Sequence, residues 1–495
     1  MGESPGKVII LPQMINRPYL LFVIVALLFL APARFVGAGQ YSQPGFYEPE
    51  VLRLENGLTL ILKQRGEAPN VSLRLVVGIG HDDFPKGAKQ TAHMLEHLLY
   101  MGTSRHDETE IDRLVQDHGG YSNAFTGNEE TIHHLDIFNQ YYLWGVDFLF
   151  ELFSDSNFSA EGVGMAAEVI GREEGGLPSS LHRWLYEHEI TKPPLEMAYA
   201  RLLANPDYQF DLETCEHISR DDILAAHKRY YVPANMTLIA VGNFDRQELL
   251  TRIKATFGAL PAQPPPVRSV WNLPYPGSAA ELDGTFSPLL DTEGNIQLIF
   301  RTDGLLSPDF HVLQVIEKYL GQKVFEELRF RRGLTYDSGA SGFATRKWGT
   351  LAVGGSVDVA RMGEVRELIE AELDRLRSGQ VAVAEIDKSR RQILLAMAGG
   401  YENNAAFADY YAGSLAELQS FGHYLNYEDA IAAVTAAQVT EVAARYLRRD
   451  RTVTIMSTPT TTIEGVGKVL GMLAILALVL GGGFYLRRRK IRGGQ

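Results

Sequence analysis

The sequence contains a single cysteine, Cys215, in 495 residues. A fold held by disulfides needs cysteines in pairs, so an intramolecular disulfide is excluded and Cys215 is expected to act as a small apolar residue. Basic residues are outnumbered by acidic ones, 47 against 60, which gives a formal net charge of −13. A surface that binds nucleic acid needs the opposite sign, which argues against that class of function.

At 495 residues the chain is too long for one ordinary hydrophobic core. Strand and helix signals repeat in two units of similar size, residues 46–260 and 284–458. Between them, residues 261–283 are rich in proline and predict a linker. We therefore expect an α+β fold of two similar domains, each with an antiparallel sheet covered by helices on one face.

The N-terminal residues 1–38 are typical of a signal peptide. Arg17 precedes an apolar run over residues 19–30, and small residues follow it, so cleavage is expected after Ala33 or Ala38. The alternative is an uncleaved N-terminal anchor.

The C-terminal residues 469–486 carry no charge and predict a transmembrane helix. The tail that follows, 487–495, is basic and is expected on the cytoplasmic side. The folded domains are therefore expected on the periplasmic or other extracytoplasmic side of the inner (cell) membrane, held there by a single-pass anchor.

The residues most informative about chemistry are His93, Glu96 and His97, which form an H-x-x-E-H motif inside an apolar helical pattern. His93 and His97 lie one helical turn apart, so both imidazoles project from one face of the helix. Two such imidazoles form part of a Zn²⁺ site, and Glu96 points to nearly the same place, where a carboxylate can take a proton from water. This order is the inverzincin signature. A zinc site needs a third protein ligand, and the candidates are Glu161, Glu168, Glu173 and Glu174.

Further blocks recur in order around the motif: Asn56-Gly57-Leu58, Lys86-Gly87, Met101-Gly102-Thr103, Gly119-Gly120, Asn123-Ala124-Phe125-Thr126 and residues 230–236. Together with the H-x-x-E-H segment they resemble the pitrilysin family of metallopeptidases, which includes insulin-degrading enzyme and the mitochondrial processing peptidase. The resemblance covers roughly residues 48–455, and the chain is similar to the two-domain members of the family. It implies a zinc metalloendopeptidase that hydrolyses peptides or unfolded polypeptides, with Zn²⁺ as its cofactor.

The resemblance also assigns the third ligand. The family pattern at residues 169–173 selects Glu173, which lies 76 residues beyond His97, with Glu174 and then Glu168 as alternatives. One position departs from the family, because the Glu that members carry seven residues before the ligand is Ala166 here. Either Glu168 or Glu161 takes its place, or zinc binding is weakened, since outer partners orient metal ligands.

The resemblance also implies that Asn123 and Ala124 bind the substrate. The segment 119–131 is expected to offer a strand edge to which an extended peptide adds, so that backbone pairing supplies the affinity. His133 and His134 lie in the strand-like run that follows and are expected to line the cleft or the sheet.

The second unit contains Arg329 and Tyr336, seven residues apart. The resemblance implies that this pair faces the active site and hydrogen-bonds the scissile carbonyl or the oxyanion that develops on it. In two-domain relatives the pair comes from a partner subunit, so a homodimer with composite sites, or a heterodimer with a related subunit, is expected. The alternative function is a catalytically weak or inactive scaffold, or a partner subunit of a peptidase heterodimer or membrane complex.

Overall fold

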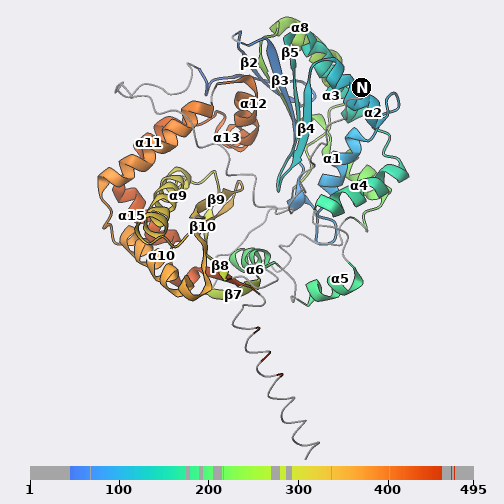
Figure 1. Ribbon diagram of the computed structural model, residues 1–495. Coiled ribbons are helices and arrows are strands. Elements are labelled where there is room, and N and C mark those ends of the chain that lie inside the picture. Colours follow the sequence, from blue (N-terminus) through green and yellow to red (C-terminus); the bar gives the residue numbers. More distant parts are fainter. Residues whose placement is uncertain are drawn as a thin grey trace, which may run out of the picture.

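Two sheets, each with its own set of helices, build the two halves of the molecule (Figure 1). The computed structural model describes residues 45–459 and the single residues 466, 470 and 473; outside the description are 67, 174–178, 189–192, 205–214, 216, 269–278, 286–291, 336 and 401. The predicted two-domain α+β fold is confirmed.

The first sheet has six strands in the order β1-β2-β6-β3-β5-β4. Its strands are β1 (Glu50–Arg53), β2 (Thr59–Gln64), β3 (Asn70–Val77), β4 (Tyr121–Thr126), β5 (Thr131–Phe138) and β6 (Met236–Gly242). The helices of this half of the chain are α1 (Thr91–Tyr100), α2 (Glu108–Asp117), α3 (Tyr142–Ser154), α4 (Ala160–Glu173), α5 (Ser180–Glu187), α6 (Pro194–Leu202), α7 (Arg220–Tyr230) and α8 (Arg246–Ala255).

The second sheet has five strands in the order β7-β11-β8-β10-β9. Its strands are β7 (Ala280–Thr285), β8 (Glu293–Asp303), β9 (Ser338–Ala344), β10 (Trp348–Asp358) and β11 (Val453–Thr458). The helices of this half are α9 (Phe310–Phe325), α10 (Met362–Arg377), α11 (Val383–Gly400), α12 (Asn404–Gly413), α13 (Leu415–Phe421), α14 (Tyr427–Ala433) and α15 (Ala436–Tyr446), with a π-helical turn, η5 (Glu326–Arg331), after α9.

The two sheets share one topology. When β1 is set aside, each sheet places its first strand beside its last, followed by its second, fourth and third strands. The last strand inserts between the first two, so the whole chain of each unit must be laid down before its sheet is complete. This repeated order agrees with the two similar domains expected from the sequence.

The prediction of purely antiparallel sheets is wrong in one strand pair of each sheet. β2 pairs with β6 in parallel, and β7 pairs with β11 in parallel, whereas the other pairs are antiparallel. Parallel neighbours need a long crossover connection, and here the remaining strands and helices of the unit supply it. Such pairing depends on residues far apart in the chain, so local sequence patterns do not reveal it.

Each sheet is covered on its second face by a helix from the other half of the chain. On the first sheet, Phe407 and Tyr411 of α12 pack against Ile61, Val76 and Ile239, on the side opposite α1 and α3 (Figure 1). On the second sheet, α6 packs Ala198 and Leu202 against Ile299, Val453 and Ile455. The expectation of helices on one face is therefore incomplete, because strands such as β6 are buried along their whole length and must be covered on both sides.

The second sheet begins earlier than the sequence predicts. β7 starts at Ala280, inside the segment 261–283 that was expected to be a linker. Its sequence Ala-Glu-Leu-Asp-Gly-Thr has few strong strand formers, and it is held by parallel pairing with β11.

Within the part of the chain that the structure describes, no helix has the length and apolar character needed to cross a membrane. The predicted signal segment 1–38 and nearly all of the predicted transmembrane segment 469–486 lie outside the described residues. Both remain predictions.

A buried cation ties α12 to the first sheet. Arg74 of β3 is only 1% exposed, and its guanidinium forms ion pairs with Asp136 of β5 at 3.0 Å and with Asp409 of α12 at 2.6 Å. His134 also lies within 3.5 Å of Asp409, so this histidine sits on the α12 face of the sheet. Because Arg74 cannot reach water, the two carboxylates supply the charge compensation that its burial requires.

Replacing Arg74 by Met is expected to lower the free energy of unfolding by about 3 kcal/mol, the low end for breaking a buried ion pair, because both carboxylates keep some contact with water. Denaturant unfolding followed by circular dichroism measures the change, with Arg53→Met on the exposed surface of β1 as the matched control. Equal stability of the two variants would show that the buried ion pairs contribute nothing to the packing of α12.

Candidate metal centre

Helix α1 carries the H-x-x-E-H residues on one face and packs its opposite face into the core. One face, made of Ala92, Met94, Leu95, Leu98 and Leu99, lies in the core of the first domain. The opposite face carries His93, Glu96 and His97, which are half-buried. The helical period therefore separates packing residues from functional ones, and the core fixes where the imidazoles point.

Three donor atoms converge beside α1. The Nε2 atoms of His93 and His97 are 3.2 Å apart, and Oε2 of Glu173, at the end of α4, lies 3.5 Å from each. In a tetrahedral zinc site with bonds of about 2.1 Å, neighbouring donors are about 3.4 Å apart. The spacing of these atoms therefore fits three of the four ligands of one zinc ion, which would leave the fourth position for water or substrate.

The other carboxylates considered as third ligands are placed differently. Glu168 is exposed and pairs with Arg172 at 2.9 Å, and Glu161 is exposed in the first turn of α4. Glu174 lies outside the described residues. Ala166 is fully buried in the core of the first domain. Since Glu168 is engaged with Arg172 on the surface, it does not replace the carboxylate that the family carries at position 166.

Glu96 is half-buried beside the three donors. Burial, followed by the neighbouring charge of Glu173, raises its pKa to about 7, although a hydrogen bond from Thr126 opposes the shift. The Thr126 hydroxyl donates to Oε2 of Glu96 at 2.5 Å and so fixes the orientation of the carboxylate. A carboxylate held in this way can take up and release a proton near neutral pH.

His93 is kept neutral, which is the form that binds a metal. Burial is the main cause, and the neighbouring imidazoles of His97 and His81 add to it, so the pKa of His93 falls to about 3. The amide oxygen of Gln90 lies 3.2 Å from Nδ1 of His93. Sequence reasoning missed Gln90 and gave Thr126 no role, because neither side chain shows a periodic pattern with the motif.

Strand β4 forms one edge of the first sheet and lies against α1. Ala124 pairs with His133 and Asn123 pairs with His134 in the register with β5. The side chain of Asn123 is exposed, and its amide donates to the hydroxyl of Tyr121 at 3.1 Å. The predicted substrate residues therefore lie on an edge strand beside the converging donors, and their role remains a prediction.

Beneath the site, His133 links two tyrosines. Its Nδ1 lies 3.3 Å from the hydroxyl of Tyr100 of α1, and its Nε2 lies 3.4 Å from the hydroxyl of Tyr231. Burial lowers the pKa of His133 to about 3, so the ring is neutral. Since both ring nitrogens face hydroxyl groups, His133 supports α1 rather than joining the metal ligands.

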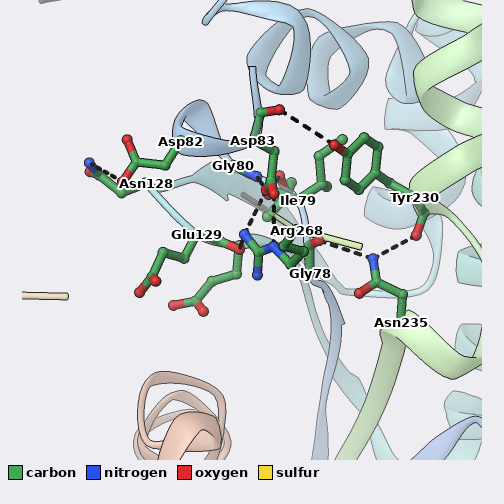
Figure 2. A network of polar contacts seen from close by, with 12 residues as sticks. Gly78, Ile79, Gly80, Asp82, Asp83, Asn128, Glu129, Tyr230, Asn235 and Arg268 are labelled. Carbon is green, nitrogen blue, oxygen red and sulfur yellow. Dashed lines mark hydrogen bonds and ion pairs between the residues drawn. The ribbon is translucent and has the colours of Figure 1, made fainter. Parts of the chain in front are cut away.

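The turn between β4 and β5 is held by a polar network (Figure 2). Arg268 donates to both carboxylate oxygens of Asp83, at 2.8 and 2.6 Å, and to the backbone carbonyl of Glu129 at 2.6 Å. From the second domain, the backbone N–H of Arg346 donates to the Glu129 carboxylate at 3.0 Å. These contacts position the strand that carries Thr126 next to Glu96.

Of the second-domain pair expected at the site, the structure describes only Arg329. Arg329 lies on η5, directly after α9, and Figure 1 shows α9 on the other side of the molecule from α1. Tyr336 lies outside the described residues.

The fold and site together define a two-domain α+β chain with an inverted metal-binding motif on the first helix after β3. Residues 59–190 match the family model "Insulinase (Peptidase family M16)", and residues 217–393 match "Peptidase M16 inactive domain". The chain belongs to peptidase family M16, as the pitrilysin-like blocks predicted.

Named relatives agree with this family. An uncharacterized zinc protease of Mycobacterium leprae is 22% identical over 416 residues, covering 80% of this chain and 88% of the relative. The mitochondrial-processing peptidase subunit beta of Blastocladiella emersonii is 25% identical over 228 residues, covering 45% of this chain and 48% of that subunit. The chain spans about half the length of the processing-peptidase subunits that it matches.

Solved structures show the same fold. A protease from Helicobacter pylori has a TM-score of 0.70 at 20% identity, covering 83% of this chain and 99% of that one. The periplasmic protease PqqL from Escherichia coli has a TM-score of 0.69 at 15% identity, covering 88% of this chain and 49% of that one.

Proposed function

We propose that this chain is a zinc-dependent endopeptidase that cleaves peptides or unfolded polypeptides. The observation that carries the proposal is the convergence of His93, His97 and Glu173 at donor spacings of 3.2–3.5 Å. Zinc held by these residues would activate a water molecule as nucleophile and polarise the scissile carbonyl.

Glu96 has the position of the general base. It takes the proton from the attacking water and passes it to the leaving amine, and Thr126 keeps its carboxylate turned toward the site. The edge of β4 pairs with the substrate backbone, with Asn123 and Ala124 beside the scissile bond. Because backbone pairing requires an extended peptide, folded proteins are poor substrates.

We further propose that the residues that hydrogen-bond the oxyanion, Arg329 and Tyr336, come from a second subunit. As the resemblance to two-domain peptidases implies, Arg329 and Tyr336 would serve the zinc site of a neighbouring chain, in a homodimer or in a heterodimer with a related subunit. A signal segment and a C-terminal anchor would place both subunits on the extracytoplasmic face of the inner membrane.

The alternative is an inactive or weakly active partner subunit that keeps the fold. The match to an inactive domain covers residues 217–393, which include neither α1 nor Glu173. The motif residues His93, Glu96 and His97 are all present, which supports the enzyme over the scaffold.

The purified chain is expected to cleave a quenched fluorogenic peptide, to lose this activity on treatment with a chelator, and to regain it with one equivalent of Zn²⁺. A folded protein that is stabilised by disulfides and contains the same peptide sequence should not be cleaved by the zinc-loaded chain. Zinc-loaded chain that cleaves no extended peptide would favour the scaffold, and cleavage that survives complete metal removal would contradict the zinc mechanism.

A further inference from the structure

Gln90 directly precedes helix α1, but its side chain does not cap the helix. The residue sits at the N-cap, yet its side chain makes no capping hydrogen bond to the helix. Its backbone carbonyl accepts from the N–H of Met94 at 2.8 Å, so the start of the helix is formed without the side chain. The residue is buried, being only 3% exposed, and its amide does not serve the start of the helix.

That amide is directed at a proposed zinc ligand. Oε1 of Gln90 lies 3.2 Å from Nδ1 of His93, on the side of the ring away from His97. If His93 binds zinc through Nε2, its Nδ1 carries a proton and needs an acceptor. The amide oxygen is an acceptor at the required place, and it selects one tautomer and one orientation of the ring.

The second imidazole has no equivalent support among the described residues. His97 contacts His93 and Glu173 through Nε2, and its Nδ1 has no hydrogen-bond partner in the part of the chain that the structure covers. Ala166, buried against α1 from α4, offers only carbon atoms. Orientation of the ligand pair thus depends on the first histidine.

We propose that Gln90 is the positioning residue of the metal centre: it acts through His93 and raises zinc affinity by holding Nε2 toward the other two donors. The inference rests on the proposed zinc site. Gln90 touches neither substrate nor the reacting atoms, so its effect falls first on metal binding and only then on hydrolysis.

The test compares zinc dissociation constants of the full chain, measured by competition with a chromophoric chelator. Gln90→Met keeps the volume but removes the acceptor, and should weaken zinc binding about tenfold to a hundredfold. Gln90→Glu restores an acceptor of the same length and should bind zinc at least as tightly as the wild type. With zinc in excess, Gln90→Met should recover most of its hydrolytic activity.

Thr91→Val is the matched control. Thr91 is also buried in the first turn, and its hydroxyl donates to the carbonyl of Ala88 at 2.7 Å and not to a ligand. This variant should lose stability but keep wild-type zinc affinity. Equal affinity of wild type and Gln90→Met, or equal weakening by Thr91→Val, would overturn the role of Gln90. A wild-type chain that binds no zinc would instead overturn the proposed function.

Discussion

Replacing Glu96 by Gln is expected to lower kcat for peptide hydrolysis by about 10³-fold, within the range supplied by a general base. The amide has the shape of the carboxylate and can still pair with the Thr126 hydroxyl, so the site keeps its geometry. What it loses is the ability to take a proton. Single-turnover hydrolysis of a fluorogenic peptide gives the rate, and metal analysis of the same sample should show about one zinc per chain.

Glu168→Gln is the control for this variant. It makes the same chemical change on α4, where the carboxylate is exposed and pairs with Arg172. Its kcat should equal that of the wild type. Wild-type activity in the Glu96→Gln enzyme, with zinc in place, would remove Glu96 from the mechanism and require another proton acceptor.

Replacing Glu173 by Ala should weaken zinc binding far beyond the tenfold to hundredfold expected for loss of an outer partner, because a direct ligand is removed. Its carboxylate is 50% exposed at the end of α4, so packing suffers little and the fold should persist. Isothermal titration of the metal-free chain with Zn²⁺ measures the affinity, and circular dichroism verifies folding.

Glu174→Ala distinguishes the two registers left open by the sequence. Glu174 directly follows Glu173 in the sequence. If Glu173 is the ligand, the Glu174→Ala variant should bind zinc as tightly as the wild type. The reverse result, with Glu173→Ala unaffected and Glu174→Ala impaired, would move the third ligand by one residue.

The local parts of this account could be predicted from the sequence. The apolar positions of α1 repeat with the helical period, so the side on which His93, Glu96 and His97 project follows from the spacing alone. Glu173 needed the resemblance to a family, because a ligand 76 residues away has no local signature among many surface carboxylates.

The remaining parts depend on contacts between distant residues. Helices α6 and α12 each pack on the sheet of the other half, and β2 pairs with β6; these contacts join segments that lie most of a domain or more apart in the sequence. Thr126 reaches Glu96 from the end of β4, and the turn that follows is held by distant contacts from Arg268 and Arg346. Gln90 looks like an ordinary polar residue before a helix, and its contact with His93 depends on side-chain orientation that no pattern encodes.

The central claim, that His93, His97 and Glu173 form one zinc site, is tested most directly by anomalous diffraction at the zinc absorption edge on crystals of the zinc-loaded chain. We predict one peak about 2.0–2.2 Å from Nε2 of His93, Nε2 of His97 and a carboxylate oxygen of Glu173. A peak held by other residues, or a fully loaded crystal with no peak beside α1, would contradict the claim.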